Sequence, residues 1–124
     1  MDAFNTPIIL TRYFYGVEER SDTDLLRQLQ QASGVVKETV MVSLLPYQFD
    51  ALICLVSDIE AGFITSSVSF QQSFLVTALN KGMFQVAAGE FHGFCYTDGR
   101  ISRRAWEKRR AEQYLFTQGK LLFD

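Results

Sequence analysis

Few side chains of this sequence could carry covalent chemistry. It has one histidine, His92, and two cysteines, Cys54 and Cys95. A cysteine nucleophile needs an adjacent base, and in the strand expected around His92 the side chain of Cys95 would point to the opposite face. A Cys/His pair would therefore need Cys54 or a break in that strand. A small enzyme using His92 with Cys54 or Cys95 is our second alternative.

The spacing of the other candidate ligands does not favour a cofactor. The acids are scattered, no His/Cys/Asp/Glu group has the spacing of metal ligands, and no glycine-rich phosphate loop is present. We therefore expect no metal and no cofactor, and we predict that the protein is not an enzyme. Both cysteines lie in apolar segments without CxxC spacing, so we expect them to be reduced and buried.

Residues 100–110 read RISRRAWEKRR and stand out in a chain with a net charge of −2. On a helix, one face would carry Arg103, Trp106, Arg110 and Tyr114. Arginine, tryptophan and tyrosine are enriched at the centres of protein interfaces, so this face is the predicted protein-binding site. Glutamates at 107 and 112 balance part of the positive charge through ordinary surface pairs. Nucleic acid is accordingly a weaker candidate partner.

The stretch from about 37 to 82 has a second pattern. Polar side chains alternate with apolar ones in KETVMVSL, Leu-Pro then opens an amphipathic helix, and a serine-capped helix follows a glycine. This order resembles the ribbon-helix-helix regulators, which dimerise through such a strand and read DNA with its outward side chains. The resemblance implies that the DNA-facing residues would be Lys37, Thr39, Met41 and Ser43. A DNA-binding regulator is the first alternative function.

The spacing of apolar residues and the helix-capping signals predict the remaining helices and strands. The predicted elements are strands at 7–15 and 35–44, helices at 21–34, about 46–60 and 67–80, β structure at 83–101 with an Asp98-Gly99 turn, and a helix from Ser102 to about Phe116. The helix at 46–60 is apolar on nearly all sides, so we expect it at the centre of the fold or in the seam of a homodimer.

These elements predict an α+β fold. A small, mainly antiparallel sheet would pack against the two central apolar helices, with a short helix in the N-terminal half and a basic C-terminal helix. The 124 residues are 48% hydrophobic and 21% charged, which fits one compact domain over 1–124 and excludes a disordered chain. No segment reads as a signal peptide or a membrane span, so a cytoplasmic protein without membrane contact is expected.

The favoured function is macromolecule binding without catalysis. An acidic, aromatic-rich domain lacking catalytic motifs is typical of small inhibitors, adaptors and accessory factors. We therefore predict a protein partner. Self-association through the 46–60 helix or through Leu121, Leu122 and Phe123 would bury surplus apolar surface.

Overall fold

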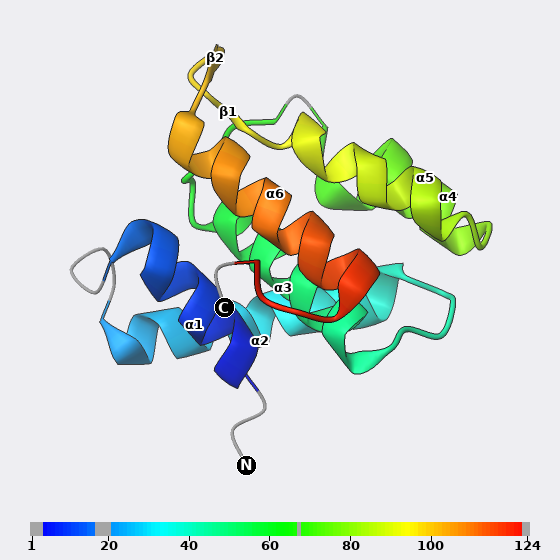
Figure 1. The fold of residues 1–124 in the computed structure, drawn as a ribbon, viewed down its shortest axis with the longest axis horizontal. Helices are drawn as coiled ribbons and strands as arrows, with labels where there is room; N and C mark the ends of the chain where they lie inside the picture. The colour runs from blue at the N-terminus through cyan, green and yellow to red at the C-terminus, as the bar shows by residue number, and fades with distance from the viewer. Residues whose placement is uncertain (1–3, 17–20, 67, 123–124) are drawn as a thin grey trace.

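The computed structural model describes residues 4–16, 21–66 and 68–122, and most of them are helical (Figure 1). The elements in chain order are α1 (Asn5–Tyr15), α2 (Asp22–Thr39), α3 (Pro46–Glu60), the 3-10 turn η1 (Phe70–Gln72), α4 (Phe74–Asn80), α5 (Phe84–Gly89), the 3-10 turn η2 (Glu90–Gly93), β1 (Tyr96–Thr97), β2 (Arg100–Ile101) and α6 (Arg103–Gln118). Within the described residues, six α-helices and a two-stranded antiparallel sheet confirm the predicted α+β class.

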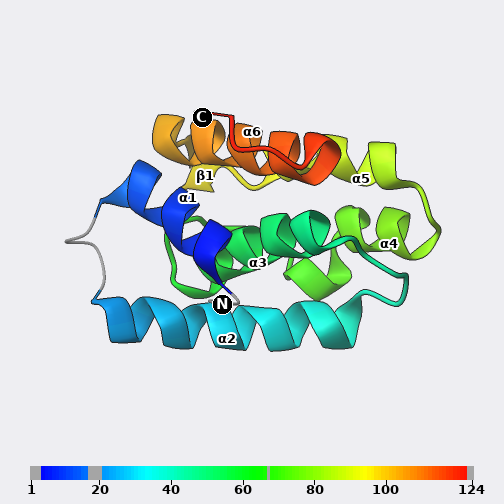
Figure 2. The same cartoon turned by 60° about the horizontal axis from the view of Figure 1, so that its bottom comes forward.

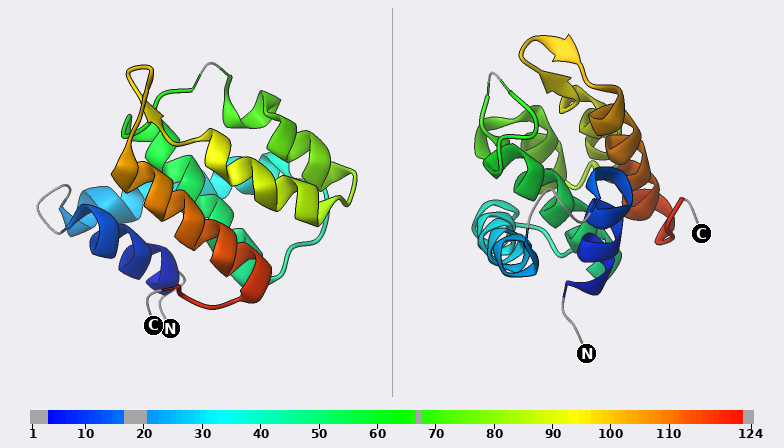
Figure 3. Two further views of the ribbon diagram at one scale, coloured as in Figure 1. Left: turned by 45° about the horizontal axis from the view of Figure 1, so that its top comes forward. Right: turned by 90° about the vertical axis from the view of Figure 1, so that its left-hand side faces the viewer.

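The helices form three layers, with α3 in the middle layer. Figure 2 shows α2 along one side, α1, α3 and α4 across the centre, and α5 and α6 along the other side. Extensive packing joins α3 to both α2 and α6, and α4 to α5. In the left view of Figure 3, the β hairpin leads into α6, and α5 runs alongside that helix.

The core is built around α3, as its uniformly apolar sequence predicts. All eight residues from 51 to 58 are buried, and the side chains of this chain's own helices cover them. This places the middle of α3 at the centre of the fold. In the described part of the chain, no helix combines the length and hydropathy needed to cross a membrane.

Local signals fix the starts of α2, α3 and α6 where the sequence predicts them, whereas the helix predicted at 67–80 begins only at Phe74, after the turn η1. The side chain of Ser21 accepts a hydrogen bond from the Asp24 backbone N–H and begins α2, and Ser102 does the same for α6 through Ala105. Pro46 occupies the first turn of α3, where its missing N–H leaves no bond unmade. The capping signals at 21, 46 and 102 are confirmed.

Two predicted strands are helical instead. The stretch 7–15 lies within α1, because burying Leu10 and Thr11 on one side of a helix outweighs the β preference of its branched and aromatic residues. The stretch 35–44 is divided: α2 continues through Gly34 to Thr39 with Val36 buried, and Val40 caps it in an extended conformation. A single glycine costs a helix only about 1 kcal/mol, which packing readily exceeds.

The predicted β region at 83–101 contains strands only at its end. Residues 84–93 form α5 and η2, because Ala87, Ala88 and Phe91 share one helical face and pack into the core. The hairpin follows, pairing Tyr96 with Ile101, and its turn falls at the predicted Asp98-Gly99. Both turn residues have positive φ, 51° and 80°, as a tight turn between two twisted strands requires.

Candidate functional site

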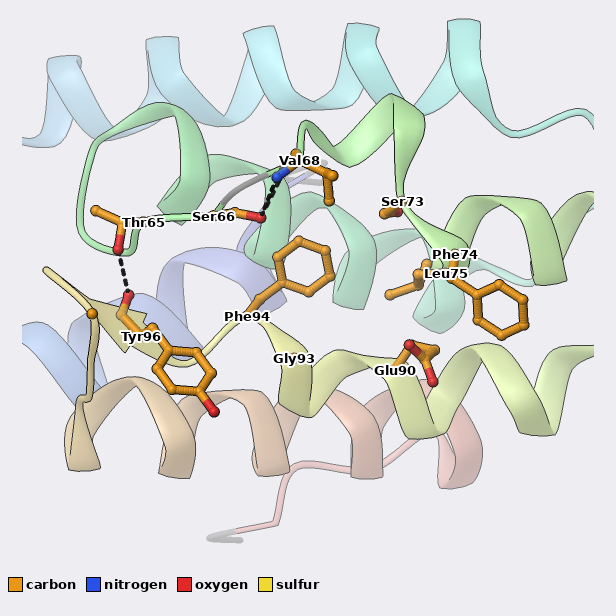
Figure 4. A pocket seen from close by; sticks show the side chains of 11 residues that line it. Thr65, Ser66, Val68, Ser73, Phe74, Leu75, Glu90, Gly93, Phe94 and Tyr96 are labelled. Carbon is orange, nitrogen blue, oxygen red and sulfur yellow. Dashed lines mark hydrogen bonds between the residues drawn. The ribbon is translucent and has the colours of Figure 1, made fainter.

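A groove of about 600 Å³ opens between the segment after α3, the start of α4, η2 and the hairpin. Figure 4 shows Thr65 and Tyr96 at one end, Phe74 and Glu90 at the other, and Phe94 between them. Its lining residues are Thr65, Ser66, Val68, Ser73, Phe74, Leu75, Glu90, Gly93, Phe94, Tyr96 and Gly99. The groove thus combines hydroxyl groups, aromatic rings and one carboxylate.

Backbone hydrogen bonds shape the groove wall formed by residues 62–66. Gly62 has φ 80° and reverses the chain after α3, and the Phe63 N–H then bonds back to the Asp58 carbonyl at 3.1 Å. The Thr65 N–H donates to the Tyr96 carbonyl at 2.8 Å, which pins this segment to the hairpin. Opposite it, the side chain of Ser73 caps α4 and so fixes the second wall.

The groove carries both polar and apolar groups. Phe74 and Tyr96 are 56% and 41% exposed, although aromatic rings ordinarily pack inside, and both lie at the groove. Glu90 is half-buried and is the one carboxylate among the described lining residues. Mostly apolar walls with a few placed polar groups are typical of ligand sites.

Between α3 and α6 lies a buried ion cluster of four charged side chains with no solvent exposure: Asp58, Lys108, Arg109 and Glu112. Lys108 Nζ lies 2.9 Å from Asp58 Oδ2 and 2.6 Å from Glu112 Oε2. Arg109 donates from Nε to Glu112 Oε1 at 2.6 Å and from Nη2 to Glu112 Oε2 at 2.7 Å. Its Nη2 also donates to Asp58 Oδ2. Two cations and two anions balance one another, which is what permits charge inside a protein.

The pKa values in the cluster favour the charged forms. Burial alone would raise the pKa of Asp58, but Lys108 and Arg109 outweigh it and hold that pKa below its usual value. Burial would lower the pKa of Lys108, yet Asp58 and Glu112 raise it above the ordinary range. The pKa of Arg109 is raised for the same reason, chiefly by Glu112 and then by Asp58. These shifts favour the charged forms of Asp58, Lys108 and Arg109 at neutral pH.

The buried ion cluster also ties the groove to the rest of the fold. Arg109 Nη1 donates to the Phe94 carbonyl at 3.2 Å, so the cluster holds the segment that carries a groove residue. At the end of α1, the Tyr15 hydroxyl donates to Asp58 Oδ2 at 3.1 Å. Burial, and then Asp58, raises the pKa of Tyr15, so its hydroxyl keeps its proton. The cluster is thus a positioning element behind the groove.

The structure puts the predicted protein-binding residues on α6, away from the buried ion cluster. Arg103 and Arg110 are exposed, Trp106 is 39% exposed, and Tyr114 is half-buried. Arg103 pairs with Glu107 at 3.5 Å, as predicted for a surface pair. The ring of Trp106 lies 5.6 Å from that of His92. A binding role for this face stays a prediction.

The DNA-binding alternative is wrong, because its ribbon does not exist. Lys37 and Thr39 belong to α2, and the only strands in the described residues are the two of the hairpin. Met41 and Ser43 follow that helix; Met41 is 85% exposed, and its backbone N–H donates to the Asn80 side chain at 2.7 Å. The strand that would pair two subunits is therefore missing.

The Cys/His pair is not a nucleophilic site. Cys54 is completely buried in α3, and burial raises the pKa of its thiol well above the usual value. Burial also raises the pKa of Cys95. A cysteine nucleophile acts as a thiolate, which both environments disfavour. His92, in η2, instead stacks on Trp106.

The sequence contained a signal for the buried ion cluster that we misread. The sequence suggested ordinary surface pairs for Lys108, Arg109 and Glu112, whereas the first two lie three and four residues after Ala105 and the third lies three before Leu115, on the core side of α6. Charge alone suggested exposure, and helical position was the better guide. Glu90 gave no comparable signal, because its groove forms only when α4, η2 and the hairpin come together.

The fold has a close counterpart among solved structures. The muramidase domain of SpmX from Asticaccaulis excentricus superposes with a TM-score of 0.71 and 21% sequence identity, covering 93% of this chain and 97% of that one. At that identity the likeness concerns the fold alone. The class defined by the fold is therefore a lysozyme-like α+β domain.

The family follows from the sequence itself. The family model described as phage lysozyme matches residues 11–113, and the chain belongs to that family. An endolysin of Bacillus phage B103 is 29% identical over 102 residues, which are 82% of this chain and 36% of that protein. The chain thus spans about a third of the length of this curated relative.

This membership corrects the predicted function. A non-enzymatic protein-binding module, whether inhibitor, adaptor or accessory factor, was the wrong expectation, because the chain belongs to the phage lysozyme family. The same findings overturn the predicted partners, a second protein, another copy of this chain or nucleic acid. The prediction rested on the absence of catalytic motifs with short, fixed residue spacing. An enzyme whose catalytic residues are far apart in the sequence shows no such motif.

Proposed function

We propose that this chain acts on peptidoglycan as a lysozyme-class glycoside hydrolase, holding a glycan strand in the groove between α4, η2 and the hairpin. The match of the phage lysozyme family over residues 11–113 carries the proposal. The names of the two relatives, an endolysin and a muramidase domain, support the same substrate.

The lining of the groove suits this substrate. Aromatic rings offer flat apolar surfaces to the C–H faces of sugar rings, and Phe74 and Tyr96 supply them at opposite ends of the groove (Figure 4). Hydroxyl groups such as that of Ser66, which donates to the Val68 carbonyl at 2.7 Å, can exchange hydrogen bonds with sugar hydroxyls. The lining is therefore suited to a neutral, hydroxyl-rich polymer.

Glu90 is the residue to which we assign the general acid. Glycoside hydrolysis needs a carboxylic acid that protonates the leaving oxygen, and Glu90 is the one carboxyl group among the described residues that line the groove. Most glycosidases also use a second carboxylate as base or nucleophile. We assign the acid to Glu90 and leave the second group unassigned.

Cosedimentation with insoluble peptidoglycan tests binding and hydrolysis separately. Wild type, Glu90→Gln and the control Glu107→Gln should all sediment with the polymer. Wild type and the control should also dissolve it, whereas Glu90→Gln should lose about a hundredfold or more in rate, as removal of a general acid does. Equal rates for Glu90→Gln and wild type would refute the assignment. A wild type that neither sediments nor dissolves peptidoglycan would refute the function.

A further inference from the structure

A second hollow lies at the far end of α6 from the groove. It has a volume of about 430 Å³ and lies between the start of α1, the first turns of α3 and the end of α6. Figure 1 shows the segment after α6 turning back toward α1, while the hairpin beside the groove lies at the opposite end of that helix. The lining residues are Thr6, Tyr47, Asp50, Tyr114, Leu115, Gly119, Lys120, Leu121 and Leu122.

Three features of the hollow favour a positive charge. Asp50 contributes a half-buried carboxylate. The sixteen-residue α6 ends at Gly119 on the edge of the hollow and has no basic residue in its last turn, so its carbonyl groups present partial negative charge there. Tyr47 and Tyr114 add aromatic rings, whose faces attract cations.

The hollow is held in shape by packing. Gly119 has φ 72°, and a Cβ at this position would lie 3.1 Å from Cδ2 of Tyr47, so the ring lies directly against the end of α6. The carboxylate of Asp50 has no hydrogen bond or ion pair with the residues that the structure describes. A ligand would therefore meet a preformed site with an unused acceptor.

We propose that this hollow binds an alkylammonium group, with Asp50 as its counter-ion and Tyr47 and Tyr114 beside its alkyl chain. A metal ion fits poorly, because Ca²⁺ or Mg²⁺ needs several oxygen ligands and the described lining offers one carboxylate beside the ammonium group of Lys120. No residue of the groove takes part, so the proposal stands apart from the proposed function.

Two charges in the hollow set the conditions for binding. Burial raises the pKa of Asp50 to about 6, so the carboxylate is ionised at neutral pH but poorly solvated. A bound cation compensates for the hydration that burial removes, so it should bind the ionised carboxylate of Asp50. Binding should therefore bring the pKa of Asp50 back toward its ordinary value. Lys120 lines the same hollow and is exposed, so its ammonium group competes with the ligand rather than holding it.

The test is a titration of the ¹⁵N-labelled chain with n-butylammonium chloride at pH 7.5, followed by NMR, with n-butanol and equimolar NaCl as controls. Butylammonium should give saturable shifts at Asp50 and Gly119 that neither control gives. A tenfold preference for the ionised form would lower the apparent pKa of Asp50 by about one unit.

Variants decide between the proposed contact and adventitious binding. Asp50→Asn keeps the shape of the side chain and should weaken butylammonium binding at least tenfold, while its amide spectrum shows that it is folded. Lys120→Gln removes the competing charge and should tighten binding several-fold. Equal shifts with butanol, unchanged affinity in Asp50→Asn, or loss of binding in Lys120→Gln would each overturn the proposal.

Discussion

Replacing Arg109 by methionine tests whether the buried ion cluster holds the fold together. Met has a similar length and no charge, so the substitution removes the guanidinium without leaving a large cavity. It deletes the donors to Asp58, Glu112 and the Phe94 carbonyl. Among the four charged side chains of the cluster, two buried carboxylates then remain with one cation, Lys108.

The expected loss follows from burial. Breaking a fully buried ion pair by removing one partner costs about 3 to 5 kcal/mol, because the remaining charge stays desolvated. Domains of this size have stabilities of about 5 to 15 kcal/mol, so the variant should lose at least about a fifth of the total. At roughly 4 °C per kcal/mol, Tm should fall by about 10 to 20 °C.

Urea unfolding followed by far-UV circular dichroism measures this loss. Arg103→Met is the matched control: it lies on the same helix, but its side chain is 92% exposed and its pair with Glu107 should contribute at most about 0.5 kcal/mol. Arg109→Met combined with Glu112→Gln restores neutrality and should be less destabilised than the sum of the two single changes. A loss below about 1 kcal/mol in Arg109→Met, or strict additivity, would refute the reasoning.

Three further predictions concern single sites. Because the pKa of Asp50 is raised from 3.8 to about 6 in the fold, the protonated form stabilises the protein below pH 4 and this contribution is lost as pH rises through 6. The shift corresponds to at most about 3 kcal/mol, and to roughly 1 kcal/mol once solvent screening of this half-buried group is allowed for. Asp50→Asn should therefore have a higher Tm than wild type at pH 8 but not at pH 4, and an equal difference at both would contradict the assignment. In Gly34→Ala, the added Cβ in α2 meets no atom within 4 Å, so the variant should be more stable by about 0.5 to 1 kcal/mol. Gly119→Ala places a Cβ at φ 72° and against Tyr47, so it should destabilise the protein by about 1 to 2 kcal/mol. Urea midpoints that move in the opposite order would count against this. Cys54 should react with a thiol-specific disulfide reagent only at the rate of unfolding, since it is buried and its pKa is raised, and modification within minutes in native buffer would show otherwise.

Local signals in the sequence predicted the starts of α2, α3 and α6, but the starts of α1, α4 and α5 were not predicted. Ser21, Pro46 and Ser102 act through bonds to their own neighbours, so the sequence alone was enough to place them. The stretch around Leu10 has β propensity, yet it forms a helix because its apolar side packs against helices that are distant in the sequence. Gly34 likewise lies inside a helix that packing sustains.

The candidate site was harder to predict because its parts are far apart in the chain. Glu90 becomes a candidate acid only when η2 lies opposite the Thr65 segment, and no fixed spacing encodes that arrangement. The helical position of Lys108 and Arg109 did mark them as inward-facing, but their charge led us to expect solvent. Burial of four ions is acceptable only because all four occur together, which a reading of one helix cannot reveal.

The chemistry of the products tests the central claim most directly. Purified peptidoglycan digested with the chain should yield soluble fragments with new reducing sugar ends, detected by borohydride reduction and mass spectrometry, and Glu90→Gln should yield about a hundredfold fewer. Glu107→Gln should match wild type. Absence of new reducing ends in the wild-type digest, or fragments released by peptide cleavage with intact glycan strands, would contradict the assignment of this chain as a glycoside hydrolase.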